Sequence, residues 1–248
     1  MERKPDLSLA RQTLPGPLQA ALEHLFAASP PNVMLVGGTA LAGFYAAHRR
    51  SDDLDLFVRN TLAFDQCRRR VRSLTQLGAK LLPQNTSPDF ARALIRFRRH
   101  SFTIDVVVDE NLFAVGTAHS AGDIRVASLQ TLLMCKAATL VSRCSEKDLY
   151  DLWWLSSQGV DLTPEVLVQL GSQIDPGVEP ESILISLAGA SPSLDACDFA
   201  LAGGPTAKTI HQRVAGLKRD LERSFGEYLE RLPPPPLARS LRQLRRIK

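Results

Sequence analysis

A turn of two glycines and a threonine, Gly37-Gly38-Thr39, constrains this chain more than any other short segment. It follows residues 33–36, an apolar run that predicts a buried strand, and it precedes a predicted helix that starts at Thr39. Glycines let a backbone approach a ligand closely, and the free N–H groups of a helix N-terminus attract phosphate. Taken alone, such a turn is more often a matter of backbone geometry, so a ligand site needs further support.

Two aspartates follow on a second predicted strand, residues 53–58 (DLDLFV). Asp53 and Asp55 are two residues apart, so both carboxylates leave the same face of the sheet. Like charges on one face repel unless a cation lies between them, and Mg²⁺ prefers oxygen ligands. The alternative is an alternating strand with its polar face in water. However, aspartate is disfavoured in strands, and two in one short strand need a reason.

A third aspartate, Asp105, lies in residues 102–108 (FTIDVVV), an otherwise apolar strand. Burying an isolated carboxylate is costly, and sharing a metal with Asp53 and Asp55 would compensate for that cost. The alternative is an aspartate at the strand edge that faces solvent. Residues 92–98 predict the partner strand, and the polar residues 99–101 predict the turn between the two.

The remaining pattern predicts an α/β (α+β) fold. Helical stripes cover residues 15–28 and 64–78, the second ending at Gly78. From about residue 128 onward the pattern is almost entirely helical. We therefore expect a mixed sheet with flanking helices over residues 1–125 and a mostly helical part over residues 126–248.

Composition limits the class of protein. The chain has 248 residues, of which 44% are hydrophobic, so it can bury a core. We expect no membrane span, because no apolar stretch approaches roughly 18 residues, and no secretory signal. The four cysteines show neither disulfide nor zinc spacing. These features predict a soluble protein of the cytoplasm.

The net charge of +4 comes from the C-terminal tail, whose last twelve residues hold five basic side chains and no acid. A run of four prolines, 233–236, separates this tail from the body. The tail could contact nucleic-acid phosphates, or it could be a solvated terminus. Its cations are Arg239, Arg242, Arg245, Arg246 and Lys248.

Lys136 is an isolated charge in an otherwise apolar helical segment, residues 128–144. A lysine that extends to the surface is the ordinary explanation. Arg143 lies seven residues further on, on the same helical face, so the two cations could line one basic wall.

Asp148 and Asp151 follow on the next predicted helix, residues 146–157. Each has a structural alternative. Ser145 is a suitable N-cap, and Asp148 three residues later completes an arrangement like a capping box. Lys147 and Asp151 are four apart and could form an ordinary ion pair within the helix.

The order of these features resembles the nucleotidyltransferase fold of the polymerase-β superfamily. More closely, LVGGTALAGFYAAHRRSDDLDLF, the helical Lys136 and CSEKDLYDLWWL are similar to the AbiEii/AbiGii family of abortive-infection nucleotidyltransferase toxins. The motifs cover roughly residues 33–157. Asp52 adds a third acid to the Asp-x-Asp strand, but the Ser51-x-Asp-x-Asp spacing selects Asp53 and Asp55.

The resemblance assigns roles to the residues above. Asp53, Asp55 and Asp105 would bind Mg²⁺ or Mn²⁺, and Lys136 and Asp148 would join them in catalysis. The nucleotide would be bound by a larger set that includes the turn and later charged residues: Gly37, Gly38, Thr39, Ser51, Lys136, Arg143 and Asp151.

The function that the resemblance implies is metal-dependent transfer of a nucleoside monophosphate from an NTP to an acceptor. Some toxins of the family use the 3′ end of tRNA, so we expect an RNA acceptor. A toxin of this kind implies a cognate antitoxin protein. Two alternatives remain open: transfer to a small molecule such as an aminoglycoside, and a non-catalytic protein of the same fold that binds a nucleotide or a partner.

Overall fold

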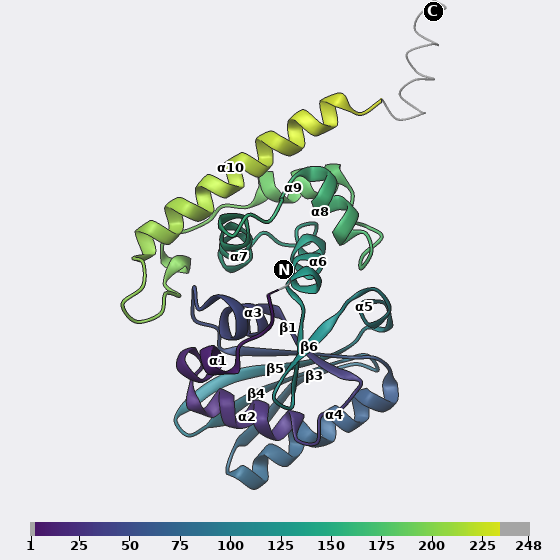
Figure 1. Cartoon of the computed structure of the whole chain (residues 1–248), viewed down its shortest axis with the longest axis vertical. Helices are drawn as coiled ribbons and strands as arrows, with labels where there is room; N and C mark the ends of the chain where they lie inside the picture. The colour runs from purple at the N-terminus through teal and green to yellow at the C-terminus, as the bar shows by residue number, and fades with distance from the viewer. Residues whose placement is uncertain (1–2, 234–248) are drawn as a thin grey trace, which may run out of the picture.

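The structure, a computed structural model, describes residues 3–233 (Figure 1). Its centre is a seven-stranded mixed sheet in the order β3-β4-β5-β2-β1-β7-β6. The pairs β2–β5 and β1–β7 are parallel, and the other neighbouring pairs are antiparallel. The strands are β1 (Val33–Val36), β2 (Asp53–Val58), β3 (Lys80–Thr86), β4 (Phe90–Phe97), β5 (His100–Val108), β6 (Ala118–Ala121) and β7 (Ile124–Ala127).

Helices cover the sheet unevenly. α2 and α4 lie along one face, α3 follows β1 on the other, and α6 and α7 lie beyond α3 (Figure 1). The helices are α1 (Leu7–Thr13), α2 (Gly16–Phe26), α3 (Gly37–Leu41), α4 (Thr61–Ser73), α5 (Glu110–Val115), α6 (Leu129–Thr139), α7 (Glu146–Ser157), α8 (Pro164–Gly171), α9 (Pro180–Gly189) and α10 (Ala207–Arg231). Shorter turns are the π-helical η1 (Ala42–Ala46), η2 (Leu74–Leu77) and η3 (Asp195–Cys197).

The alternation of the sequence determines which face of the sheet is buried. Leu54 and Leu56 of β2, with Ile104 and Val106 of β5, are at most 1% exposed. α4 packs over this face, because its amphipathic sequence turns Phe64 and other apolar residues inward. The intervening residues of β2 and β5, including the aspartates, therefore point to the opposite face.

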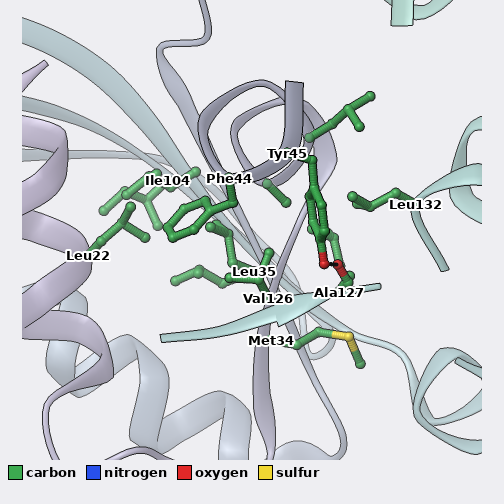
Figure 2. Close-up of a cluster of buried hydrophobic side chains, with 14 of the residues drawn as sticks. Leu22, Met34, Leu35, Phe44, Tyr45, Ile104, Val126, Ala127 and Leu132 are labelled. Carbon is green, nitrogen blue, oxygen red and sulfur yellow. Dashed lines mark hydrogen bonds between the residues drawn. The ribbon is translucent and has the colours of Figure 1, made fainter. Parts of the chain in front are cut away.

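The centre of the core lies around β1, all four of whose residues are buried. Leu35, Phe44 and Tyr45 meet Leu132 of α6 in one apolar cluster (Figure 2). The Tyr45 hydroxyl donates a hydrogen bond of 2.9 Å to the carbonyl of Ala127, so the polar end of this buried ring is satisfied. This cluster connects the sheet to the helices that follow it.

Most predicted elements are present, with differences at their ends. The strands at 33–36 and 53–58 are confirmed. The helix predicted from Thr39 begins at Gly37, so both glycines lie in its first turn. Between the strand predicted at 102–108 and the helical pattern from about 128, where no element was predicted, the structure contains α5, β6 and β7. β3 was not predicted, and its irregular pairing with β4 at Pro83 and Asn85 explains how an edge strand accommodates a proline.

The division of the chain at residue 125 stays a prediction. That boundary falls inside β7, whose Val126 pairs with Leu35 of β1. No helix within residues 3–233 is long and apolar enough to cross a membrane. Residues 234–248, which hold most of the proline run and all five cations of the basic tail, lie outside the described residues.

Candidate active site

Three aspartates share one face of the sheet, as the sequence predicted. Asp53 and Asp55 are two residues apart on β2, and Asp55 is paired directly with Asp105 of the parallel strand β5. Residues directly opposite each other on neighbouring strands point to the same side, as do residues two apart along a strand. All three carboxylates line a cleft of about 490 Å³.

The surroundings of Asp55 disfavour its charged form. Burial, together with the charges of Asp105 and Asp53, raises the pKa of Asp55 to about 6. Its side chain packs against Gly37, since a Cβ on that glycine would lie 1.9 Å from Oδ2 of Asp55. Gly37 also has a φ of +69°, which favours glycine. Gly37 thus provides the space that Asp55 occupies.

Gly38 and Thr39, the other two residues of the turn, contact the residues at and just before the start of β2. Gly38 lines the cleft, and a Cβ there would lie 2.5 Å from Nη2 of Arg49 and 3.0 Å from Oγ of Ser51. The Thr39 hydroxyl is buried and donates to Ser51 Oγ at 3.0 Å and to the carbonyl of Asp53. Of the three turn residues predicted to surround phosphate, Gly38 is the one that lines the cleft. The Thr39 side chain instead connects α3 to β2 through its hydrogen bond to the carbonyl of Asp53.

Arg92 of β4 forms an ion pair with the carboxylate of Asp105, the third of the three aspartates. It is paired directly with Asp105 in the antiparallel β4–β5 ladder. Its Nε donates to Oδ1 of Asp105 at 2.7 Å, and its Nη2 donates to Oδ2 at 2.5 Å. The Arg92 side chain is 43% exposed and the Asp105 side chain 12%. Sequence reasoning missed Arg92, because only the strand register brings it opposite Asp105.

A buried ion cluster forms the wall of the cleft on the helical side. Asp151 of α7 is fully buried and accepts from Arg49 Nε at 2.6 Å and from Arg49 Nη2 at 2.8 Å. Lys136 Nζ lies 2.7 Å from Oδ2 of Asp151, and His48 Nε2 lies 2.8 Å from Oδ1. These cations, with hydrogen bonds from Arg49 and His48, hold the pKa of Asp151 well below its usual value despite its burial.

This cluster corrects one expectation and adds two residues. The ion pair that the sequence offered for Asp151 was Lys147, but its observed partners are Lys136, Arg49 and His48. Arg49 and His48 were not predicted. Burial is the dominant influence on the pKa of His48 and lowers it. The neighbouring Arg-Arg pair just before the Ser-x-Asp-x-Asp motif was the available signal for Arg49.

Asp148 belongs both to the cap of α7, as the sequence predicted, and to the buried ion cluster. Ser145 caps α7, accepting from the backbone N–H of Asp148 at 3.3 Å and donating its hydroxyl to Asp148 Oδ2. Lys136 Nζ donates to Oδ1 of Asp148 at 2.7 Å, and Arg143 Nε lies 3.2 Å from Oδ2. Lys136 therefore faces the cleft as predicted, but its ammonium is buried between Asp148 and Asp151.

Two exposed cations complete the cleft. Arg143 and Lys147 both line it. The side chain of Arg143 is 67% exposed, and Lys147 is also exposed. Unlike the ammonium of Lys136, both side chains are open to solvent and to a ligand in the cleft, although Arg143 also contacts Asp148.

The acidic side of the cleft suits a hard divalent cation at Asp53 and Asp55. Carboxylate oxygens are the ligands that such ions prefer, and the pKa of Asp55 is raised by burial and by neighbouring negative charge that a cation would balance. Both oxygens of Asp105, however, accept hydrogen bonds from Arg92. Within residues 3–233, no three His, Cys, Asp or Glu side chains already have the spacing of a metal site.

Comparison with known proteins supports the fold and identifies the family. Residues 20–231 match the family described as "Nucleotidyl transferase AbiEii toxin, Type IV TA system". No curated protein matches the chain. MenT4, nucleotidyltransferase toxin Rv2826c from Mycobacterium tuberculosis H37Rv, has a similar structure with a TM-score of 0.52 and 17% identity, over 84% of this chain and 85% of that one.

A second solved structure, JHP933 from Helicobacter pylori, has a TM-score of 0.50 and 16% identity, over 92% of this chain and 94% of that one. At such identities these likenesses show a shared fold. The family match is broader evidence, because it spans the sheet, the ion cluster and the helices that follow. The chain therefore belongs to the AbiEii family of nucleotidyltransferase toxins of type IV toxin–antitoxin systems, and it is a nucleotidyltransferase.

Proposed function

We propose that this nucleotidyltransferase transfers a nucleoside monophosphate from an NTP to the 3′ end of an RNA, tRNA in particular. The observation that carries the proposal is the gathering of Asp53, Asp55 and Asp105 in one cleft with the exposed cations Arg143 and Lys147. Acids on one side and exposed cations on the other suit a triphosphate whose α-phosphorus is attacked beside the acids.

In this proposal Asp53 and Asp55 hold Mg²⁺ or Mn²⁺, which when bound would polarise the triphosphate and acidify the acceptor hydroxyl. Asp105 takes the proton from that hydroxyl, for which one of its oxygens must be free of Arg92. The acceptor oxygen then bonds to the α-phosphorus, and pyrophosphate leaves. The contribution of the protein is mainly the positioning of these groups.

The phosphates would be bound by residues that line the cleft. These are Gly38 through its backbone N–H, and Ser51, Arg143 and Lys147 through their side chains. Lys136 and Asp151 act chiefly as positioning residues, because the charge of Lys136 is already balanced by two buried carboxylates. Asp148 connects them to the cap of α7.

The RNA acceptor and the biological role rest on the family resemblance and on charge. Some toxins of the family modify the 3′ end of tRNA, and the basic tail could contact RNA phosphates. As a toxin of a type IV system, the protein would act in the cytoplasm and be opposed by a cognate antitoxin protein.

The test is incubation of the purified protein with each labelled NTP and with Mg²⁺ or Mn²⁺. Parallel reactions offer total tRNA, total protein or an aminoglycoside panel as the acceptor. We expect label on tRNA that periodate oxidation of its 3′ end prevents. Asp53→Asn should abolish the labelling while leaving the melting temperature similar or higher. Label on the small molecules alone would refute the RNA acceptor.

A further inference from the structure

The sheet face that carries the three aspartates continues across β5, β4 and β3, and no helix within residues 3–233 lies over that part of it (Figure 1). We call this surface the open sheet face, and define it by Lys80, Leu82, Arg92, Leu94, Arg96 and Thr103. Alternate residues of β4 show the contrast: Arg92 and Arg96 are exposed, whereas Ala93, Ile95 and Phe97 are buried under α4 on the other side.

Strand register arranges this face in rows that run toward the acids. Leu82 pairs with Leu94, Leu94 with Thr103, and Thr103 with Asp53. The apolar residues of this row, Leu82 and Leu94, are followed by Thr103 and then by Asp53. The Thr103 hydroxyl donates to Oδ1 of Asp53 at 2.7 Å. Leu82 at the outer end of the row is 44% exposed, so the row presents apolar surface to solvent.

Cations flank the apolar row on both sides. On one side Lys80 of β3 lies opposite Arg96 of β4 in the strand register. On the other side Arg92 of β4 lies opposite Asp105 of β5. Within residues 3–233, neither Lys80 nor Arg96 has an ion-pair partner. Arg92 and Thr103 also line the cleft, so the open sheet face and the cleft form one continuous surface.

We infer that the open sheet face binds the single-stranded 3′ end of the RNA acceptor and leads its terminal hydroxyl to Asp53 and Asp105. This inference rests on the proposed function. Unpaired nucleotides present apolar base faces and anionic phosphates, and proteins bind them with apolar platforms beside a positively charged path. Here the Leu82–Leu94 row offers the platform, and Lys80 and Arg96 offer the path. Neighbouring strands lie roughly 4.8 Å apart, so the row spans about 14 Å from β3 to β2.

The test variant is the double substitution Lys80→Glu and Arg96→Glu. Its matched control is Arg69→Glu with Arg72→Glu, which makes the same charge change at exposed residues of α4, on the other side of the sheet. We expect the test variant to raise the KM for tRNA by about tenfold or more and to leave the KM for NTP and the melting temperature unchanged. In RNA binding without NTP, the slope of log K against log salt should decrease by about 1.4, for two phosphate contacts to a single strand.

Photo-crosslinking gives a second readout. A tRNA with a photoreactive 3′-terminal nucleotide should crosslink to β3 or β4 in the wild-type protein, and Leu82→Ser should reduce the yield. If wild-type protein modifies RNA but the test variant and its control have equal KM values, the inference is wrong and the proposed function stands. If wild-type protein modifies only a small molecule, the RNA acceptor itself is wrong. Loss of antitoxin binding, with RNA transfer unchanged, would assign the face to the antitoxin instead.

Discussion

Arg92 donates two hydrogen bonds to the carboxylate of Asp105, one to each oxygen. The pair connects β4 and β5 at the point where the catalytic candidates meet the open sheet face. Arg92 and a divalent cation would therefore compete for the same carboxylate.

The first prediction follows from that competition. Arg92→Ala should bind Mn²⁺ several-fold more tightly than the wild type, because a cation has been removed from beside the metal ligands. Electron paramagnetic resonance of free Mn²⁺ measures this affinity without turnover. Arg96→Ala, four residues further along β4 on the same face, is the control and should bind Mn²⁺ as the wild type does. Weaker binding by Arg92→Ala would mean that Arg92 orients Asp105 for the metal.

The second prediction concerns pH. The pKa of Asp55 rises from 3.8 to about 6 on folding, so between these values the folded protein holds a proton that the unfolded chain releases. The contribution of Asp55 therefore makes the free energy of unfolding fall as pH rises from about 4 to about 6, and the loss persists above that range. Asp55→Asn should remove it and stabilise the protein by up to about 3 kcal/mol at pH 8.

Urea denaturation at pH 4 and pH 8, in the presence of a metal chelator, measures this difference. Asp195→Asn, at an exposed residue of η3, is the control and should change stability equally at both pH values. An Asp55→Asn variant less stable than the wild type at pH 8 would contradict the prediction.

The third prediction concerns Lys136. Replacing it with methionine leaves Asp148 and Asp151 buried with fewer cations, which should cost on the order of 3–5 kcal/mol of folding free energy. Chemical denaturation measures this cost. Lys136→Arg should recover only part of the stability, because a planar guanidinium replaces a compact ammonium. A Lys136→Met variant with wild-type stability and no use of NTP would show that Lys136 binds the triphosphate directly.

The fourth prediction concerns the exposed cations. Lys147→Ala, alone or with Arg143→Ala, should raise the KM for NTP by about tenfold and leave the melting temperature within a degree or two, because neither side chain is buried. Lys208→Ala, at an exposed position of α10 outside the cleft, is the control. An unchanged KM would remove both residues from the proposed triphosphate site.

The sequence was sufficient to predict the strand that carries Asp53 and Asp55, and the strand that precedes it. A run of apolar residues predicted β1, alternation predicted β2, and the two-residue spacing predicted the common face of Asp53 and Asp55. These features depend on local periodicity, which a sequence displays directly. The same is true of the Ser145 cap, whose hydroxyl and partner are three residues apart.

The Arg92–Asp105 pair could not be found in this way, because it depends on strand register. A turn at residues 99–101 was predicted, whereas the structure turns at Arg98 and Arg99, both with positive φ. With the predicted turn, Asp105 would lie opposite Ile95. With the observed turn, it lies opposite Arg92. The two-residue turn matches the twist of an antiparallel hairpin, but arginine gives little sequence signal for positive φ.

The buried cluster around Asp151 has a consequence for how this family can vary. Arg49 enters it from the segment before β2, Lys136 from α6 and Asp151 from α7. A change at one of these positions leaves a buried charge without its partner, which destabilises the fold. A compensating change at another position restores the charge balance. Positions 49, 136 and 151 should therefore change together across homologous sequences, as a covarying set that links the two halves of the chain.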